Sequence, residues 1–318
     1  MLLFPISFLT AFLLTILATP AAIKLAFKIG AVDTPNQRKI HTDTIPRLGG
    51  IAIFFGFFSA LILGLIIAFF SGSKLNLLPI FGITLGSIII VLLGIKDDMK
   101  SLKPSTKFFW QIVAATVAYG FGVSVSFMTN PFNGLMAIPM IISFPLTLLW
   151  IVGVTNAINL IDGLDGLAAG VTAISASILF FVALRTHQIG AALTMLCLAG
   201  AALGFLRYNF FPAKIFLGDS GSLLLGFVLA TSSIIGVFKT TLVVALIIPL
   251  LILGVPIFDT LFAIGRRMKE GQPVFKADNK HIHHMLLRAG FTQREAVLSI
   301  YIVCFLLGLS ALVMVLFK

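Results

Sequence analysis

Charged residues are scarce in this sequence, and cysteine is almost absent. Only 10% of the 318 residues are Asp, Glu, Lys or Arg, whereas 59% are hydrophobic and the mean hydropathy is +1.13. A water-soluble fold of this composition would expose far more apolar surface than such proteins carry. The two cysteines, Cys197 and Cys304, lie in apolar stretches, which argues against a disulfide framework and a zinc site. The sequence therefore predicts a membrane protein.

Apolar runs of about 20 residues, the length that crosses a bilayer, recur along the whole chain. We expect an all-α polytopic protein with ten transmembrane helices, or eleven if the stretch 127–140 hides another element, in one catalytic domain, 1–318. The first run ends in LATPAA, which resembles a signal-peptidase site, but no basic residue precedes Lys24, so we interpret it as a retained span. The expected spans are 3–28, 48–70, 77–95, 107–126, 141–160, 166–185, 188–207, 218–238, 241–264 and 296–317.

Basic residues are distributed unequally between the loops. Those that follow the odd-numbered spans, with the adjoining span ends, hold 18 of the 22 Lys and Arg residues. By the positive-inside rule these loops face the cytoplasm, and both termini lie outside. All eleven acidic residues also lie on the cytoplasmic half, which predicts that the functional site is on this face. The net charge of +11 favours the binding of anionic lipids. The cytoplasmic loops are expected at about 29–47, 96–107, 159–166, 207–218 and 265–295.

The first two cytoplasmic loops offer groups for phosphate binding and acid–base chemistry. The loop VDTPNQRKIHTDTIPRLGG contains Arg47 and ends in a glycine pair, which allows close backbone approach to a ligand but also suits a plain polar linker. In the second loop Asp97 and Asp98 are adjacent, between Lys96 and Lys100. Paired carboxylates near lysines can hold Mg²⁺ or act as a base. The simpler alternative is that these aspartates only balance the charge of the neighbouring lysines at a helix end.

The third loop, NAINLIDGLDGLAAG, is the most informative. Asn159, Asp162 and Asp165 recur every three residues, with glycines between them. Polar groups at a membrane boundary need partners, and amide and carboxylate oxygens suit a hard cation. This loop therefore predicts a functional site.

The fourth loop contains FLGDSGS at the start of an expected helix. Asp219 in this motif is explained by ordinary helix capping, but a helix N-terminus also attracts phosphate, and an Asp there could hold Mg²⁺ against a diphosphate. Phe216, three residues earlier, offers a flat face to a nucleotide base.

The fifth loop brings together histidines and basic residues. His281, His283 and His284 follow three basic residues at 266–269. Zinc is one interpretation, but the spacing is unusual, and the alternative is a hydrogen-bonding, cationic lining for phosphate and sugar. Asp259 lies about 10 Å deeper along the preceding helix, where we expect it to face the bundle and pair with a basic group.

Together the five loops indicate a Mg²⁺-dependent reaction on a phosphate or diphosphate at the membrane surface. No Walker loop is present, which argues against ATP hydrolysis, and nothing indicates nucleic acid as a partner. A lipid flippase or transporter is the alternative from another class, but transporters place ionisable residues near the bilayer midplane.

The chain resembles the polyprenyl-phosphate N-acetylhexosamine-1-phosphate transferases, from about residue 30 to 295. The shared motifs, in order, are DTPNQRKIHTDTIPRLGG, KDD, NAINLIDGLDGLAAG, PAKIFLGDSGSL and HIHHMLLRAG. It is most similar to the branch that makes undecaprenyl-diphospho-N-acetylglucosamine. The phospho-N-acetylmuramoyl-pentapeptide transferases, the alternative branch, usually carry three consecutive histidines, where this chain has HIHH.

The resemblance implies that UDP-N-acetylglucosamine and undecaprenyl phosphate react to give the lipid diphospho-sugar and UMP. It further implies a bacterial cytoplasmic membrane location, a role early in a cell-envelope polysaccharide pathway and compatibility with a homodimer. By motif position, Asp219 would be the main ligand of Mg²⁺, for which Mn²⁺ could substitute, and Asn159 a second ligand. Phe216 would stack on uracil, with Asp165 and Asp162 also at the nucleotide.

The remaining implied roles concern the phosphates and the sugar. Asp98, with Asp97, would act on the lipid phosphate, Lys107 and Arg47 would bind phosphates, and the three histidines would line the sugar-diphosphate pocket. Two mechanisms are open: direct attack by the lipid phosphate, which we favour, and attack by an Asp with a covalent intermediate.

Overall fold

The computed structural model describes residues 2–34, 44–73, 75–130, 134–237, 248–272 and 281–317. Most of them are helical, as the long apolar runs predict, because lipid offers no partner for backbone N–H and C=O groups. The helices are α1 (Leu3–Ile29), α2 (Gly49–Phe70), α3 (Leu77–Met99), α4 (Pro104–Gly120), α5 (Met140–Ile161), α6 (Leu167–Arg185), α7 (Ile189–Asn209), α8 (Gly218–Val237), α10 (Gly254–Lys269), α11 (Ile282–Arg288) and α12 (Gln293–Leu316).

Eight of the described helices are long and apolar enough to cross a membrane: α1, α2, α3, α5, α6, α7, α8 and α12. They correspond to eight of the ten expected spans, which confirms a polytopic helical membrane protein. The expected span 107–126 coincides with α4, whose 17 residues reach about 25 Å. The expected span 241–264 lies partly outside the described residues, so the count of ten stays a prediction.

Two short antiparallel hairpins complete the fold. Strands β1 (Val32–Asp33) and β2 (Ile45–Pro46) pair at the base of the first loop. Strands β3 (Phe127–Asn130) and β4 (Gly134–Ala137) pair across the stretch 127–140. The expectation of an eleventh membrane element in that stretch is wrong, because strands of four residues are far too short to cross a bilayer.

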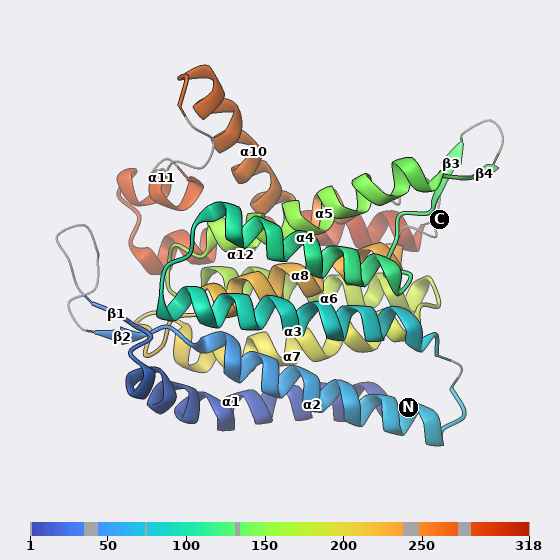
Figure 1. Ribbon diagram of the computed structural model, residues 1–318, viewed down its shortest axis with the longest axis horizontal. Helices are drawn as coiled ribbons and strands as arrows, with labels where there is room; N and C mark the ends of the chain where they lie inside the picture. The colour runs from blue at the N-terminus through green and yellow to red at the C-terminus, as the bar shows by residue number, and fades with distance from the viewer. Residues whose placement is uncertain are drawn as a thin grey trace.

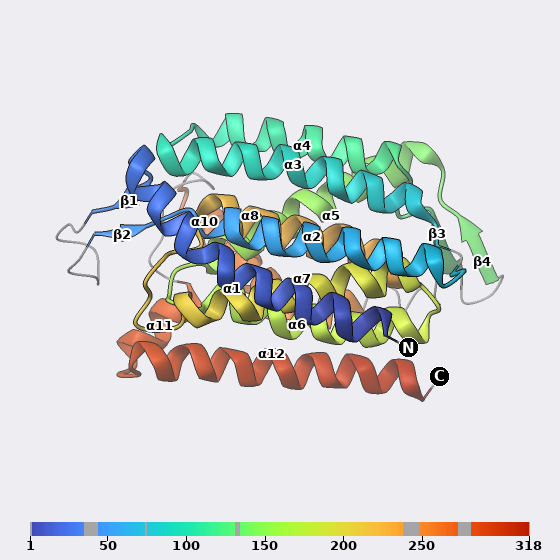
Figure 2. The ribbon, with the colours of Figure 1, turned by 90° about the horizontal axis from the view of Figure 1, so that it is seen from below.

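Helix α8 forms the centre of the bundle (Figures 1 and 2). In its apolar stretch 89% of the residues are buried, against 28% in α1 and α12, which lie at the periphery. Helices α3 and α5 pack on either side of α8, and glycines permit the close approach. A Cβ on Gly94 would come within 2.3 Å of the backbone of Ser220, and one on Gly226 within 2.7 Å of Thr155. The first turn of α8 is therefore held firmly by its neighbours.

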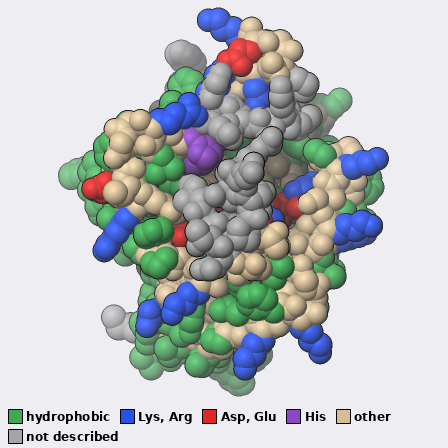
Figure 3. All heavy atoms as spheres, turned by 90° about the vertical axis from the view of Figure 1, so that its left-hand side faces the viewer, with side chains coloured by type: hydrophobic (Ala, Val, Ile, Leu, Met, Phe, Trp, Pro, Cys, Tyr) green, Lys and Arg blue, Asp and Glu red, His purple; other side chains and the backbone are tan. Residues whose placement is uncertain are grey.

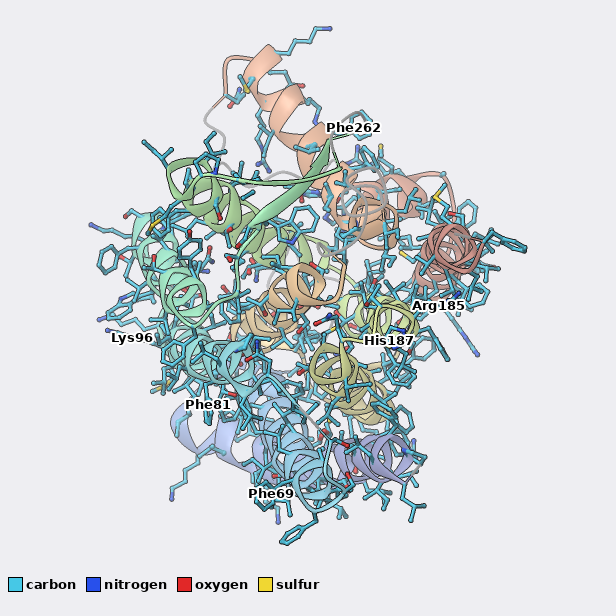
Figure 4. All side chains as sticks on the ribbon, turned by 90° about the vertical axis from the view of Figure 1, so that its right-hand side faces the viewer. Phe69, Phe81, Lys96, Arg185, His187 and Phe262 are labelled. Atoms are coloured by element: carbon cyan, nitrogen blue, oxygen red, sulfur yellow. The ribbon has the colours of Figure 1, made fainter. Side chains whose placement is uncertain are left out.

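The motif-bearing loops gather at one end of the bundle, and both chain ends lie at the other (Figure 2). Figure 3 looks onto the loop end, where Lys and Arg side chains stand around the rim and some acidic side chains and a histidine lie nearer the middle. The opposite end faces the viewer in Figure 4 and carries Arg185 and His187. The charges therefore divide between the two ends as the loop pattern predicts.

Candidate active site

Asp98 caps the central helix α8. Its Oδ1 accepts the backbone N–H of Asp219 at 2.8 Å, and its Oδ2 accepts that of Ser220 at 3.0 Å. Gly218 begins the helix with φ +68°, a left-handed conformation that suits glycine, and a Cβ there would lie 2.2 Å from the carbonyl oxygen of Arg47. The expectation that the start of α8 offers its free N–H groups to a substrate phosphate is wrong for these two groups, because Asp98 occupies them.

Lys107 joins two carboxylates that come from different loops. Its Nζ lies 2.7 Å from Oδ2 of Asp97 and 2.5 Å from Oδ2 of Asp219. Pro104 begins α4, so Lys107 stands on the first turn of that helix, facing the end of α3. Oδ1 of Asp97 accepts the backbone N–H of Leu102 at 2.7 Å, which fixes the loop between α3 and α4. All three charged side chains are largely buried, so their interactions are stronger than they would be in water.

Asn159 approaches the same carboxylate from α5. Its Nδ2 donates to Oγ of Ser222 at 2.7 Å and to Oδ1 of Asp219 at 3.3 Å. The Ser222 hydroxyl in turn donates to the carbonyl oxygen of Gly218 at 3.0 Å. The nitrogen of Asn159 therefore binds α8, and no described residue donates a hydrogen bond to its amide oxygen. An amide oxygen beside a carboxylate is the kind of donor set that Mg²⁺ accepts.

A reciprocal amide pair lies one helical turn deeper. Nδ2 of Asn156 donates to Oε1 of Gln111 at 2.6 Å, and Nε2 of Gln111 approaches Oδ1 of Asn156 at 3.4 Å. Gln111 is four residues after Lys107 on α4, and Asn156 is three before Asn159 on α5, so each shares a helix face with a site residue. No role for these two residues is predicted from the sequence, although their spacing from Lys107 and Asn159 is a signal that would find them.

The turn between α5 and α6 is fixed to two other helices. Oδ2 of Asp165 accepts the backbone N–H of Ala213 at 2.9 Å, just after α7. Gly166, at φ +80°, donates its N–H to Oδ1 of Asn209 at 3.1 Å, and its carbonyl oxygen accepts the Tyr301 hydroxyl at 2.5 Å. Asp165 thus has a partner that holds the loop before α8, and its expected contact with the uracil edge stays a prediction.

Asp162 lies in the same turn, within electrostatic reach of the carboxylate cluster. Burial raises the pKa of its carboxyl group to about 8, and the negative charge of Asp219 adds to that shift, while Arg47 opposes it. Its carboxylate makes no hydrogen bond to the described residues. A cation beside this group would favour its charged form, which is consistent with a place next to a metal or a positively charged ligand group.

Phe216 and Arg47 come together where the first and fourth loops meet. The backbone N–H of Phe216 donates to Pro46 at 2.8 Å, and its carbonyl oxygen accepts the N–H of Gly49 at 3.1 Å. Arg47 forms an ion pair with Asp33 at 3.4 Å and keeps about a third of its side chain exposed. Residues 35–43 of the first loop lie outside the described part of the chain. The base-stacking and phosphate-binding roles of Phe216 and Arg47 stay predictions.

The three expected histidines reach this region from α11. His283 is 1% exposed, and its ring contacts that of His284 at 4.3 Å between centroids. Its Nε2 packs against Gly163, where a Cβ would lie only 2.3 Å away. Burial lowers the pKa of His283 to about 4, with His284 and His281 adding to the shift, so the ring is neutral at pH 7. Among the described residues no three His, Cys, Asp or Glu side chains group as a metal cage, so zinc has no support there.

Comparisons with known proteins show which sequences this chain is similar to. The family model described as glycosyl transferase family 4 matches residues 80–237. A Bacillus subtilis protein named "Probable undecaprenyl-phosphate N-acetylglucosaminyl 1-phosphate transferase" is 41% identical, over 97% of this chain and 84% of its own length. A Mycobacterium tuberculosis decaprenyl-phosphate N-acetylglucosaminephosphotransferase is 36% identical, over 92% and 78%. The Escherichia coli K12 undecaprenyl-phosphate alpha-N-acetylglucosaminyl 1-phosphate transferase is 29% identical, over 94% and 81%.

Proposed function

The chain belongs to glycosyl transferase family 4, and from that premise we propose that it transfers N-acetylglucosamine 1-phosphate from UDP-N-acetylglucosamine to undecaprenyl phosphate. An oxygen of the lipid phosphate attacks the sugar-bearing phosphorus of the nucleotide sugar. The bond from that phosphorus to the bridging oxygen breaks, and UMP leaves. The lipid product is undecaprenyl-diphospho-N-acetylglucosamine.

The observation that carries this proposal is the cluster formed by Asp97, Lys107 and Asp219, with Asn159 beside it. The reaction brings two anionic phosphates together, so the site needs positive charge where the new bond forms. Lys107 supplies one such charge at the junction of α3, α4 and α8. Because its ammonium group has three donors, it can contact a phosphate oxygen while it keeps at least one carboxylate partner.

We propose Mg²⁺ as the cofactor, with Mn²⁺ as a substitute, held by a carboxylate oxygen of Asp219 and the amide oxygen of Asn159. The donors fit, because Mg²⁺ usually takes one or two protein oxygens and completes its shell with water and substrate phosphates. When bound, the ion would neutralise the diphosphate charge and stabilise the departing UMP. Ser222 holds the Asn159 nitrogen, so the amide oxygen takes no part in that hydrogen bond and can serve as a ligand.

We favour direct attack by the lipid phosphate over a covalent aspartyl intermediate. Both carboxylate oxygens of Asp98 accept backbone N–H groups of α8, so an attack by Asp98 would require that helix end to lose its cap. Asp97 is the more suitable partner for the lipid phosphate, because its Oδ2 contacts the ammonium group of Lys107 and does not cap the backbone of α8. In this proposal Asp97 and Lys107 orient the phosphate rather than form a bond to the sugar phosphate.

We place the working end at the cytoplasmic face of a bacterial inner membrane, where UDP-sugars are available. The positive-inside distribution of Lys and Arg supports this orientation. The basic rim is suited to anionic lipid headgroups, which would keep the lipid phosphate acceptor near the site. The orientation can be tested by introducing single cysteines at Lys103 and at Ser73, which lie at opposite ends of the bundle. Each cysteine is then labelled with a membrane-impermeant reagent.

The decisive experiment is UMP release by the purified protein with undecaprenyl phosphate and Mg²⁺. UDP-N-acetylglucosamine and UDP-N-acetylmuramoyl-pentapeptide should be compared, and only the first should react. Asn159→Ala should raise the Mg²⁺ concentration for half-maximal rate, whereas Asn76→Ala, at the opposite end of the bundle, should not. Turnover of the muramoyl substrate alone would assign the protein to the phospho-N-acetylmuramoyl-pentapeptide transferase branch. Uptake of the nucleotide sugar or flipping of the lipid without UMP release would contradict the proposal.

A further inference from the structure

Asp259 is a buried carboxylate that the proposed reaction does not use. It lies on α10 and is 8% exposed. Its Oδ2 is 2.8 Å from Nδ1 of His281, and its Oδ1 accepts the backbone N–H of Ile282 at 2.9 Å. The expectation that Asp259 pairs with a basic group is thus confirmed. Both oxygens hold the point where the histidine segment, residues 281–284, enters α11.

The contact continues from Asp259 to the turn between α5 and α6. The ring of His281 lies parallel to that of His283, with 5.9 Å between centroids and 2° between planes. His283 in turn packs against Gly163, so close that no side chain would fit there. Gly163 lies between Asp162 and Asp165, the two carboxylates expected at the nucleotide. A continuous series of contacts, buried from Asp259 to His283, therefore links α10 to the nucleotide half of the site.

Stability alone is a weak explanation for this pair. Removing two polar groups from water costs much of what their attraction returns, and well-packed apolar residues usually serve at least as well. A carboxylate fixes the orientation of the groups that donate hydrogen bonds to it, which an apolar side chain cannot do. A hydrogen bond to Nδ1 fixes the rotation of the imidazole ring and keeps a proton on that nitrogen, so Nε2 becomes the free position. The same carboxylate also fixes the first amide of α11.

We propose that Asp259 is a positioning residue for the nucleotide-sugar half of the site. Through His281 and His283 it holds the histidine segment against the turn that carries Asp162 and Asp165. This inference rests on the proposed function for its kinetic consequences, but the linkage itself does not depend on turnover. Asp259 does not contact the reacting atoms in this assignment.

The kinetic test uses Asp259→Asn, which keeps the size of the side chain and one acceptor oxygen. The expected result is a rise in KM for UDP-N-acetylglucosamine of about tenfold, equivalent to the loss of one good contact. The KM for undecaprenyl phosphate should change less than about twofold, since that half of the site is built on α3 and α4. Thr260→Val is the matched control, because the neighbouring Thr260 hydroxyl has no hydrogen-bond partner among the described residues. Equal losses for both substrates would overturn the proposal.

A double-substitution cycle tests whether Asp259 acts through His281. If it does, His281→Asn and Asp259→Asn should each raise the KM for the nucleotide sugar, and the double variant should be little worse than either single variant. Rescue of the KM by Asp259→Glu, which restores the charge, would support the assignment further. Fully additive effects of the two single changes would show that Asp259 does not act through His281 and would overturn it.

Hydrogen–deuterium exchange provides a readout that needs no activity. Asp259→Asn should speed amide exchange in the peptide that covers 282–288 and also in the turn at 162–166, while α1 and α2 stay unchanged. Faster exchange in α11 alone would mean that the path ends there, which overturns the positioning role. If the wild-type protein released no UMP, the proposed function would fail, but this exchange pattern would still decide whether the linkage exists.

Discussion

The carboxylate of Asp98 caps helix α8 by accepting the backbone N–H of Asp219, although 121 positions separate the two residues. Helix N-termini expose N–H groups without partners and carry partial positive charge, and an anionic acceptor satisfies both. The cap also explains how Asp219 is held in reach of Lys107. Asp98 therefore controls the position of the proposed metal ligand, whether or not it takes part in the chemistry.

Asp98→Ala should destabilise the protein and weaken its response to Mg²⁺. Two buried N–H groups would lose a charged acceptor. Each lost hydrogen bond should lower the free energy of unfolding by up to about 3 kcal/mol. The expected result is a lower thermal unfolding midpoint together with a higher Mg²⁺ concentration for half-maximal UMP release. Asp97→Ala removes one backbone acceptor and one of the two carboxylate partners of Lys107, and it should lower the midpoint less, because Lys107 keeps Asp219. A fall in kcat alone, with stability and Mg²⁺ requirement unchanged, would instead identify Asp98 as a catalytic group.

Lys107→Met should abolish most of the activity without preventing folding. The carboxylates of Asp97 and Asp219 would then face each other without the ammonium group between them, and the attacking phosphate would lose a positive partner. Removing one group that stabilises transition-state charge typically lowers kcat by about 10²–10³-fold. UMP release measures this, with Lys103→Met as the matched control, because Lys103 is an exposed lysine just before the same helix. Comparable losses in both variants would mean that the general basic charge of the face matters, rather than Lys107.

The bilayer explains why so much of the fold could be predicted from the sequence. A span needs about 20 apolar residues, so eight helices were recognisable from composition alone. The β3–β4 hairpin was not, because its side chains are moderately apolar and the pairing depends on contacts between strands rather than on length. Hydropathy placed the apolar first part of α10 in the expected span 241–264, but it did not predict the charged end of the helix at 265–269.

The candidate site was predicted only as a set of residues. The spacing in NAINLIDGLDGLAAG placed Asn159 and Asp162 at a membrane boundary, and the structure brings Asn159 against Asp219. The sequence could not show which donors the side-chain oxygens of these residues accept hydrogen bonds from. Asp98 was expected to face a substrate, but the backbone of α8 is a nearer donor. The Asp259–His281 pair similarly joins two segments whose relative position only the folded chain defines.

Gly94→Ala should disturb the site even though glycine carries no chemistry. A Cβ at this position would lie 2.3 Å from the Cα of Ser220 and 2.7 Å from the carbonyl carbon of Asp219, so α3 must move away from α8. That movement separates Asp98 from the N–H groups that it caps. We expect a lower unfolding midpoint and a raised Mg²⁺ requirement, as in Asp98→Ala. Gly120→Ala, where a Cβ meets nothing within 4 Å, should be neutral or slightly stabilising, because alanine favours helix. Equal behaviour of the two variants would contradict the close-packing explanation.

His283 should make the protein sensitive to mild acid. Its pKa in the folded state is lowered to about 4 by burial, whereas an unfolded chain titrates near 6.5. Between these values the unfolded state binds the extra proton, so stability falls as the pH drops below about 6.5. At pH 5 the loss attributable to this residue should be about 2 kcal/mol.

Replacing the titrating ring isolates its contribution to that loss. In His283→Leu the unfolding midpoint should change less between pH 7.5 and pH 5 than in the wild type, even if the variant is less stable at pH 7.5. His187→Gln, which removes an exposed histidine at the opposite end, should keep the wild-type pH dependence. An unchanged pH dependence in His283→Leu would mean that the ring titrates alike in the folded and unfolded states, which would contradict the lowered pKa. A steeper pH dependence in the variant would mean that folding raises the pKa of His283, so that the ring is a cation against the turn that holds Asp162 and Asp165.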